Sequence, residues 1–123
     1  MAAWTTDELD AIASAEELEL QPVRSDDSFG NPVTLWAVRA GDEIYVRSVN
    51  GRGSSWFRRV QIRHEARIVA GGVEKDVSLV EADEAQDAID AAYEAKYGPL
   101  DPSNVPPIVA PEARAAMLKL VPR

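Results

Sequence analysis

Seven arginines lie within residues 39–67, and they are the side chains of this chain best suited to chemistry with an anion. They are Arg39, Arg47, Arg52, Arg58, Arg59, Arg63 and Arg67. The segment contains only three acidic residues and carries +4, whereas the whole chain carries −8 at pH 7. A guanidinium group is planar and can hold phosphate or carboxylate through two hydrogen bonds at once. The cluster therefore predicts a local anion-binding site on an otherwise acidic protein.

The middle of this segment, residues 47–56, adds further groups that an anion site uses. Arg47 and Ser48 precede a loop, Gly51-Arg52-Gly53-Ser54-Ser55, which Trp56 follows. Glycines permit left-handed turns in which successive backbone N–H groups form an anion-binding nest. The loop lacks the Gly-Lys-Ser/Thr ending of a Walker loop and the third glycine of a dinucleotide fingerprint. Two interpretations stay open at this point: a phosphate-binding loop, or a plain hairpin loop with solvated arginines.

The remaining polar residues offer little acid–base chemistry. The chain has no cysteine and a single histidine, His64, which lies beside arginines and is typical of a surface residue. The acidic residues within 83–94 are spaced as a solvated helix face rather than as a carboxylate pair or a metal cluster. We therefore predict no metal site, and we assign no catalytic residue. A cofactor that carries its own redox chemistry would need only binding and orientation from the protein.

Length and composition limit the class of protein. A chain of 123 residues with 46% hydrophobic residues predicts one domain, spanning 1–123, with an ordinary core. The sequence shows neither a signal peptide nor an apolar run of about 20 residues, so we expect a soluble cytoplasmic protein without membrane contact. The isoelectric point near 4.6 argues against nucleic acid as a general partner.

The first half of the chain predicts a short helix followed by strands. Thr5 and Glu8 form a capping-box pattern that starts a helix ending near Ala15, and Trp4 can pack on Leu9. Alternation predicts a strand over 18–23. The nearly continuous apolar run 33–38 predicts one strand covered on both faces, and Gly41-Asp42 predicts a hairpin turn into 44–47. There, Tyr45 and Arg47 should face one side and Ile44, Val46 and Ser48 the other.

The second half predicts a hairpin, a helix and a final strand. Residues 56–63 are compatible with either a strand or a turn and helix. Gly71-Gly72 predicts the turn of a hairpin between 66–70 and 76–80. Asp83 is the expected N-cap of a helix that Gly98-Pro99 ends. Residues 100–110 should be extended and 117–121 a strand. Tight turns between successive strands predict a mainly β fold, an antiparallel sheet or barrel with flanking helices.

Several short motifs together resemble a family of bacterial proteins known as domain-of-unknown-function family 2255. The residues that carry the resemblance are Pro32-Val33-Thr34-Leu35-Trp36, Ile44-Tyr45-Val46-Arg47-Ser48, Gly51, Trp56, Gly71-Gly72, Asp76-Val77, Asp90-Ala91-Ala92-Tyr93, Lys96-Tyr97-Gly98 and Leu120-Val121-Pro122-Arg123. They cover nearly the whole chain. The family is similar in turn to the deazaflavin-dependent, nitroreductase-like branch of the flavin-binding split-barrel superfamily.

The resemblance implies a split β-barrel of about six antiparallel strands, assembled as a homodimer. It implies an FMN or deazaflavin cofactor near the dimer interface and hydride transfer between that cofactor and a substrate. The cofactor-binding residues that it implies are Arg47, Ser48, Gly51, Ser54, Ser55 and Trp56, to which the loop motif adds Arg52. The chain departs from the nitroreductase-like branch at Arg58-Arg59, where that branch usually has Asn-Leu.

Three functional hypotheses follow. The first is a flavin- or deazaflavin-dependent oxidoreductase that binds a phosphorylated cofactor at the Arg/Gly/Ser loop. The second is a non-catalytic split-barrel dimer that binds another anionic small molecule. The third, which the acidic composition disfavours, is a nucleic-acid-binding stripe of arginines with Trp56 and Phe57 as stacking partners. We favour the first.

Overall fold

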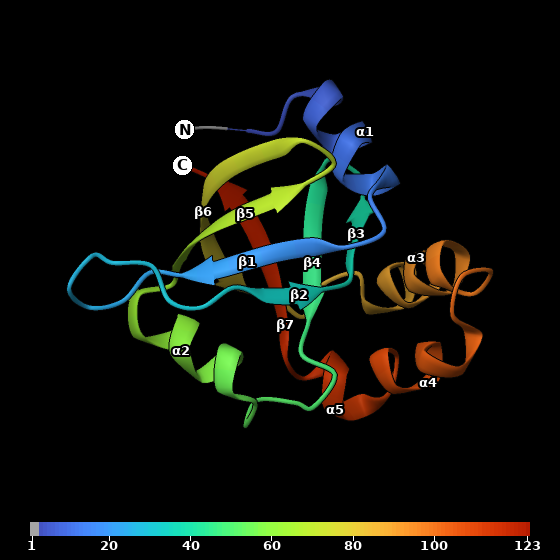
Figure 1. The fold of residues 1–123 in the computed structure, drawn as a ribbon. Coiled ribbons are helices and arrows are strands. Elements are labelled where there is room, and N and C mark those ends of the chain that lie inside the picture. Colours follow the sequence, from blue (N-terminus) through green and yellow to red (C-terminus); the bar gives the residue numbers. More distant parts are fainter. Residues whose placement is uncertain (1–2) are drawn as a thin grey trace.

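Seven antiparallel strands form one sheet that curls into a nearly closed barrel in the computed structural model, which describes residues 3–123 (Figure 1). The strands are β1 (Leu18–Pro22), β2 (Val33–Leu35), β3 (Ala37–Ala40), β4 (Glu43–Arg47), β5 (Glu65–Ala70), β6 (Val73–Glu81) and β7 (Met117–Pro122). Their order across the sheet is β2-β1-β5-β6-β7-β4-β3. The predicted antiparallel split barrel is confirmed, with seven strands rather than about six.

Trp36 joins the two edges of this sheet. β2 and β3 are the edge strands, and Trp36 alone separates them in the chain. Because consecutive Cα atoms are about 3.8 Å apart, edges linked by one residue must approach each other, so the sheet closes there. The predicted single strand over 33–38 is therefore wrong. Its apolar run is shared by two strands, with Leu35 inside the barrel and Val38 in a second core outside it.

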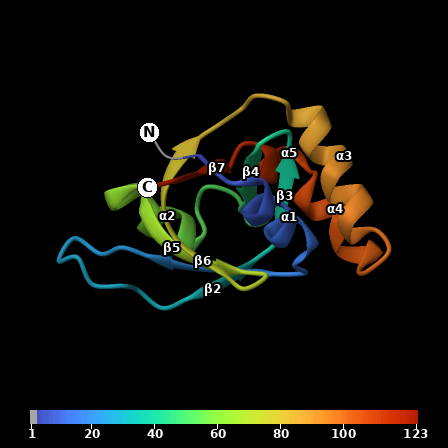
Figure 2. The ribbon, with the colours of Figure 1, turned by 90° about the horizontal axis from the view of Figure 1, so that it is seen from above.

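Five α-helices and one short 3-10 helix surround the barrel in the described part of the chain. They are α1 (Thr6–Ser14), α2 (Ser55–Arg63), α3 (Gln86–Tyr97), the 3-10 helix η1 (Pro102–Asn104), α4 (Val105–Ile108) and α5 (Pro111–Arg114). Figure 2 shows α3 and α4 together on one flank, with α2 on the other side of the barrel. The ambiguous segment after the glycine–serine loop is therefore a helix, α2.

Two hydrophobic cores result, one inside the barrel and one between the barrel and α3. β4 separates them. Its side chains alternate, so that Ile44 and Val46 fill the barrel, while Tyr45 packs outward against α3 and α4. Arg47 shares the outward face with Tyr45, as predicted, and bonds to residues of α3. A strand that is covered on both faces can place a polar side chain in a fully enclosed position.

The helix predictions were right for α1 and partly wrong for α3. Thr5 and Glu8 form the predicted capping box. α3 begins later than predicted: its N-cap is Ala85 in a left-handed conformation, and Asp83 does not cap it. The reason is that the side chain of Gln86, the first helical residue, bonds instead to Arg47 and to the Arg114 carbonyl oxygen. A tertiary contact has replaced the local capping pattern.

The predicted extended tail over 100–110 is also wrong. It contains η1 and α4, and α5 follows it. Each of these short helices has a proline at its first or second position, where the missing N–H and fixed φ of proline are tolerated. Val105 and Ile108 are buried against α3. At the other end, Pro122 belongs to β7 and pairs with Val77. No helix in residues 3–123 combines the length and apolar character required to cross a bilayer.

Lys96 on α3 predicts a measurable pH dependence of stability. It is half-buried, and its Nζ donates to the Ala37 carbonyl oxygen at 2.7 Å. Desolvation lowers its pKa to about 8, from an ordinary value of 10.5. Between these two values the unfolded chain binds the proton that the folded chain has released, so this group adds stability as pH rises.

The unfolding free energy of the wild type relative to Lys96→Met should therefore increase from pH 8 to pH 10 and be flat from pH 6 to pH 7. Urea denaturation at each pH measures this difference. A difference that stays constant through pH 10 would contradict a buried ammonium at this position.

Candidate functional site

A cleft lies where the barrel closes, and we call it the seam cleft. Its volume is about 460 Å³, within the range of small-molecule sites. Segments far apart in the sequence form it: the β2–Trp36 link, the end of β4 with the following loop, the start of α2, and the η1–α4 region. The lining residues are Val33, Thr34, Leu35, Trp36, Arg47, Val49, Asn50, Trp56, Asp101, Asn104 and Ile108. The lining is mainly apolar, with two indole rings.

Arg47 is the charged residue most deeply placed in this cleft. Its side chain has no exposed area. Nη1 forms an ion pair with Asp90 and donates to the Ile108 carbonyl oxygen at 3.1 Å. Nη2 donates to the Gln86 side-chain oxygen at 2.6 Å. The guanidinium carbon lies 5.4 Å from the centre of the Tyr93 ring. Arg47 is therefore held rigidly between the barrel and the C-terminal helices.

One nitrogen of the Arg47 guanidinium group makes no hydrogen bond within residues 3–123. Its Nε is buried and has no hydrogen-bond partner among the described residues. An unsatisfied buried donor is costly, and it is found where a ligand or water completes the bonding. Because Asp90 already neutralises the guanidinium, this donor suits a carbonyl or ring-nitrogen acceptor better than a phosphate dianion.

The glycine–serine loop is organised by contacts within itself. The Ser48 hydroxyl is buried, donates to the Gly51 carbonyl oxygen, and lies 2.7 Å from the Ser54 hydroxyl. Gly51 has φ +81°, and a Cβ there would approach Glu112 at 2.6 Å. Ser54 is the N-cap of α2 but makes no side-chain cap bond. The glycine at this turn serves backbone conformation and close packing against α5.

Arg52 and Ser55 point to the surface. Arg52 bonds to both carboxylate oxygens of Glu81, at 2.6 and 3.1 Å, and lies over the Phe57 ring. These hydrogen bonds raise the pKa of Arg52 and lower that of Glu81. Ser55 is exposed at the first position of α2. Of the predicted cofactor residues, Arg47 and Trp56 therefore line the seam cleft, while Arg52 is committed to Glu81.

The two tryptophans of the cleft differ in how they are held. Trp36 stacks on Tyr97, with ring centres 4.0 Å apart and planes 5° from parallel. Trp56 is 8% exposed and packs edge-on against Phe57. Both tyrosines of α3, Tyr93 and Tyr97, are buried and donate to backbone carbonyl groups, so both serve to pack this helix on the barrel. Burial raises the pKa of each.

Ion pairs account for most of the arginine cluster. Five of the seven arginines contact a carboxylate: Arg39 with Asp10, Arg47 with Asp90, Arg52 with Glu81, Arg63 with Asp27, and Arg67 with Asp76. These five acidic partners lie outside the 39–67 segment, so the local excess of positive charge is largely neutralised in three dimensions. Phe57 is 1% exposed and Trp56 is 8% exposed, so neither presents a face on which a nucleic-acid base could stack.

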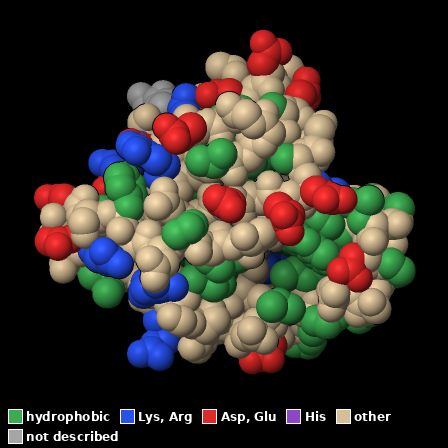
Figure 3. Space-filling view, in the orientation of Figure 1, with side chains coloured by type: hydrophobic (Ala, Val, Ile, Leu, Met, Phe, Trp, Pro, Cys, Tyr) green, Lys and Arg blue, Asp and Glu red, His purple; other side chains and the backbone are tan. Residues whose placement is uncertain are grey.

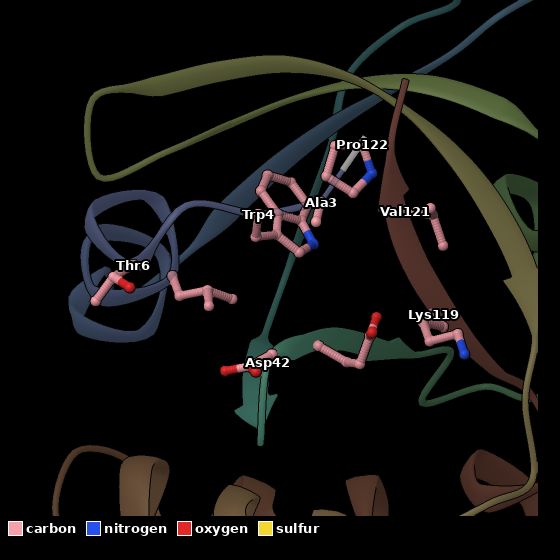
Figure 4. A pocket seen from close by; sticks show the side chains of 9 residues that line it. Ala3, Trp4, Thr6, Asp42, Lys119, Val121 and Pro122 are labelled. Atoms are coloured by element: carbon pink, nitrogen blue, oxygen red, sulfur yellow. The ribbon is translucent and has the colours of Figure 1, made fainter. Parts of the chain in front are cut away.

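A second hollow, which we call the terminal hollow, lies between the start of α1, the β3–β4 turn and β7. Figure 4 shows Trp4 beside Ala3 and Pro122, with Asp42 and Lys119 across the space from them. Its volume is also about 460 Å³. Lys119 is paired with Glu84, whose pKa is lowered by the hydrogen bond from Tyr45. Because Asp42 and Glu43 also line it, this hollow is poorly suited to an anion.

No group of three or more His, Cys, Asp or Glu side chains within residues 3–123 is arranged to hold a metal ion. The candidate site therefore consists of the seam cleft and the loop at its rim.

Comparison with known families agrees with the resemblance found in the sequence. The family described as "Uncharacterized protein conserved in bacteria (DUF2255)" matches residues 8–120. The chain belongs to this family. No curated protein matches the sequence significantly.

Solved structures show the same fold at low sequence identity. The heme storage protein HutZ from Vibrio cholerae has a TM-score of 0.61 and 13% identity, over 93% of this chain and 86% of its own. A FAD-binding protein from Mesorhizobium loti has a TM-score of 0.58 and 12% identity, over 99% and 92%. An F420 reductase has a TM-score of 0.55 and 14% identity, over 93% and 90%. All three are split-barrel proteins, and the similarity shows that this DUF2255 chain has the split-barrel fold.

The sequence did not reveal the residues that surround Arg47. Asp90 lies in a run of acidic residues that resembles a solvated helix face, and Gln86 and Ile108 carry no motif. A usable signal was present only in the face assignment of β4, which put Arg47 on the same side as Tyr45, and the structure shows that this side is covered by α3 and α4. An arginine on such a face requires a carboxylate from the covering helix.

Proposed function

We propose that this DUF2255 protein binds a flavin-type cofactor, FMN or a deazaflavin, in the seam cleft and acts as an oxidoreductase. The observation that carries the proposal is the pairing, in one cleft, of two indole rings with a buried arginine that has an unsatisfied Nε. The split-barrel fold, shared with a FAD-binding protein and an F420 reductase, supports it.

The residues of the cleft fit a planar heterocycle. Trp36 offers an aromatic surface on which a flat ring can stack, and Trp56, which is 8% exposed, forms part of the cleft wall. Asn50 and Asn104 provide amide groups for the edge of the ring, and Arg47 Nε, which has no exposed area, can donate to that edge once the lining opens. When bound, a flavin or deazaflavin supplies hydride transfer through its own ring system. The protein binds the ring, orients its edge and limits the access of water.

The loop at the rim has a supporting part in this proposal. Val49 and Asn50 of this loop line the cleft, and we place the polar tail of the cofactor beside the neighbouring Gly51 backbone and the hydroxyls of Ser48, Ser54 and Ser55. Arg52 reaches such a tail only by giving up its bonds to Glu81. We further propose that the protein works as a homodimer, with the cleft near the interface.

Binding is tested by titrating the purified protein with FMN and with deazaflavin while recording tryptophan fluorescence. We expect saturable quenching with a dissociation constant on the order of 10 µM or less for one of them. Trp36→Phe should remove much of the quenching, and Trp4→Phe, in the terminal hollow, should retain it. Absence of saturable quenching by both cofactors would refute the proposal.

The alternative, a non-catalytic split barrel that binds another anionic molecule, gives different results in the same assay. It predicts thermal stabilisation by a phosphorylated metabolite without redox chemistry and none by FMN or deazaflavin. Because the fold resembles that of a heme storage protein, heme must be among the ligands tested in this screen.

A further inference from the structure

Two arginines of the 39–67 segment form no ion pair with the described residues. Arg58 and Arg59, adjacent in α2, contact no carboxylate among residues 3–123, in contrast to the other five arginines of the segment. The Nε of Arg59 is buried and has no hydrogen-bond partner there either. The chain has 21 acidic side chains and a net charge of −8, so two neighbouring arginines without an acidic partner are unusual.

These two arginines share one face of α2 with a hydroxyl group. Ser55, Arg58, Arg59 and Ile62 follow the i, i+3, i+4, i+7 spacing of a single helix face. They line a shallow hollow of about 240 Å³. The opposite face of the helix, which carries Trp56, Phe57 and Val60, is buried in the barrel core. The arginines are therefore directed outward by the packing of the helix itself.

The surroundings of this hollow are favourable to an anion. The helix contains no acidic residue. The Ser54 hydroxyl is used by Ser48 and does not cap the first turn. Figure 3 shows Lys and Arg side chains gathered over the region where Figure 1 places α2. The positive end of the helix and both guanidinium groups thus act in the same direction.

We propose that Arg58 and Arg59, with the Ser55 hydroxyl, bind a phosphate monoester. If the proposed cofactor function holds, on which this identification of the ligand rests, the group bound is the cofactor's phosphate. Ser55 lines the hollow on α2 and the next residue, Trp56, lines the seam cleft, so both sites border the first turn of this helix. One ligand can then place its ring in the cleft and its phosphate on the helix.

This assignment differs from the one that the loop motif suggests. Arg47 is neutralised by Asp90 and Arg52 by Glu81, so a phosphate at either position would have to displace a carboxylate. Arg58 and Arg59 need no such exchange. Two adjacent guanidinium groups can also satisfy several phosphate oxygens at once.

The test compares FMN with riboflavin, which has the same ring and no phosphate. We expect the wild type to bind FMN about tenfold more tightly than riboflavin, the gain of a charge-assisted phosphate contact. Arg58→Gln/Arg59→Gln should bind the two equally, and Arg58→Lys/Arg59→Lys should recover part of the preference. The control Arg24→Gln/Arg67→Gln also removes two positive charges and should keep the wild-type ratio.

The outcomes separate the two proposals. If riboflavin binds but the glutamine variant keeps the preference for FMN, the phosphate assignment is wrong and the cofactor function stands. If no flavin or deazaflavin binds, the cofactor function fails, and inorganic pyrophosphate then decides the phosphate assignment. Thermal stabilisation of the wild type by pyrophosphate, absent in Arg58→Gln/Arg59→Gln, supports it, and equal or no stabilisation of both overturns it.

Discussion

Asp90→Ala should lower the free energy of unfolding by about 3 kcal/mol, the usual cost of removing one partner of a buried ion pair. Arg47 has no exposed side-chain area, and Asp90 is its one carboxylate contact among residues 3–123. Without Asp90 the guanidinium stays in the interior with only neutral acceptors, Gln86 and the Ile108 carbonyl group. Urea denaturation followed by tryptophan fluorescence measures the change.

Asp87→Ala is the matched control, because it removes the same charge from the same helix and also ends an ion pair, with Arg114. The Asp87 carboxylate is fully exposed, so no measurable change is expected. Arg47→Met should cost less than Asp90→Ala, since Asp90 keeps Arg114 and is partly exposed. Equal losses for Asp90→Ala and Asp87→Ala would contradict the buried pair.

Gly71→Ala should destabilise the fold by a similar amount, about 3 kcal/mol. Gly71 begins the β5–β6 turn with φ +57°, a conformation that costs a residue with a Cβ about 1 kcal/mol or more. The added methyl group would also collide with the Ala11 carbonyl group of α1. Because this obstacle is helix backbone, relief requires α1 to move away from the barrel, which adds the larger share.

Gly72→Ala isolates the backbone contribution. Gly72 has φ +82°, and a Cβ there would meet no atom within 4 Å. We therefore expect a loss of about 1 kcal/mol, measured by the same urea denaturation. If both variants lose equal stability, the contact between α1 and the hairpin is not tight.

Local patterns predicted the elements that local contacts decide. The Thr5–Glu8 capping box and the Gly71-Gly72 hairpin each depend on residues a few positions apart, and both are present. The face assignment of β4 also held, because alternation follows from strand geometry alone. With the family resemblance, these features were sufficient to predict an antiparallel split barrel.

Long-range contacts decided what the sequence could not predict. The run 33–38 divides at Trp36 because the sheet closes there, and no local residue marks that event. Similarly, the charge of residues 39–67 indicated an anion site, but acidic residues from distant parts of the chain neutralise five arginines. Asp90 lies 43 positions from Arg47, so that pair is visible only once the fold is known.

Diffraction from crystals grown with saturating FMN, and from crystals grown with saturating deazaflavin, tests the central claim most directly, because it locates the ligand. The account predicts the ring in the seam cleft, in contact with Trp36, Trp56 and Arg47 Nε. Ring density in the terminal hollow, or no ring density with either cofactor, would contradict it.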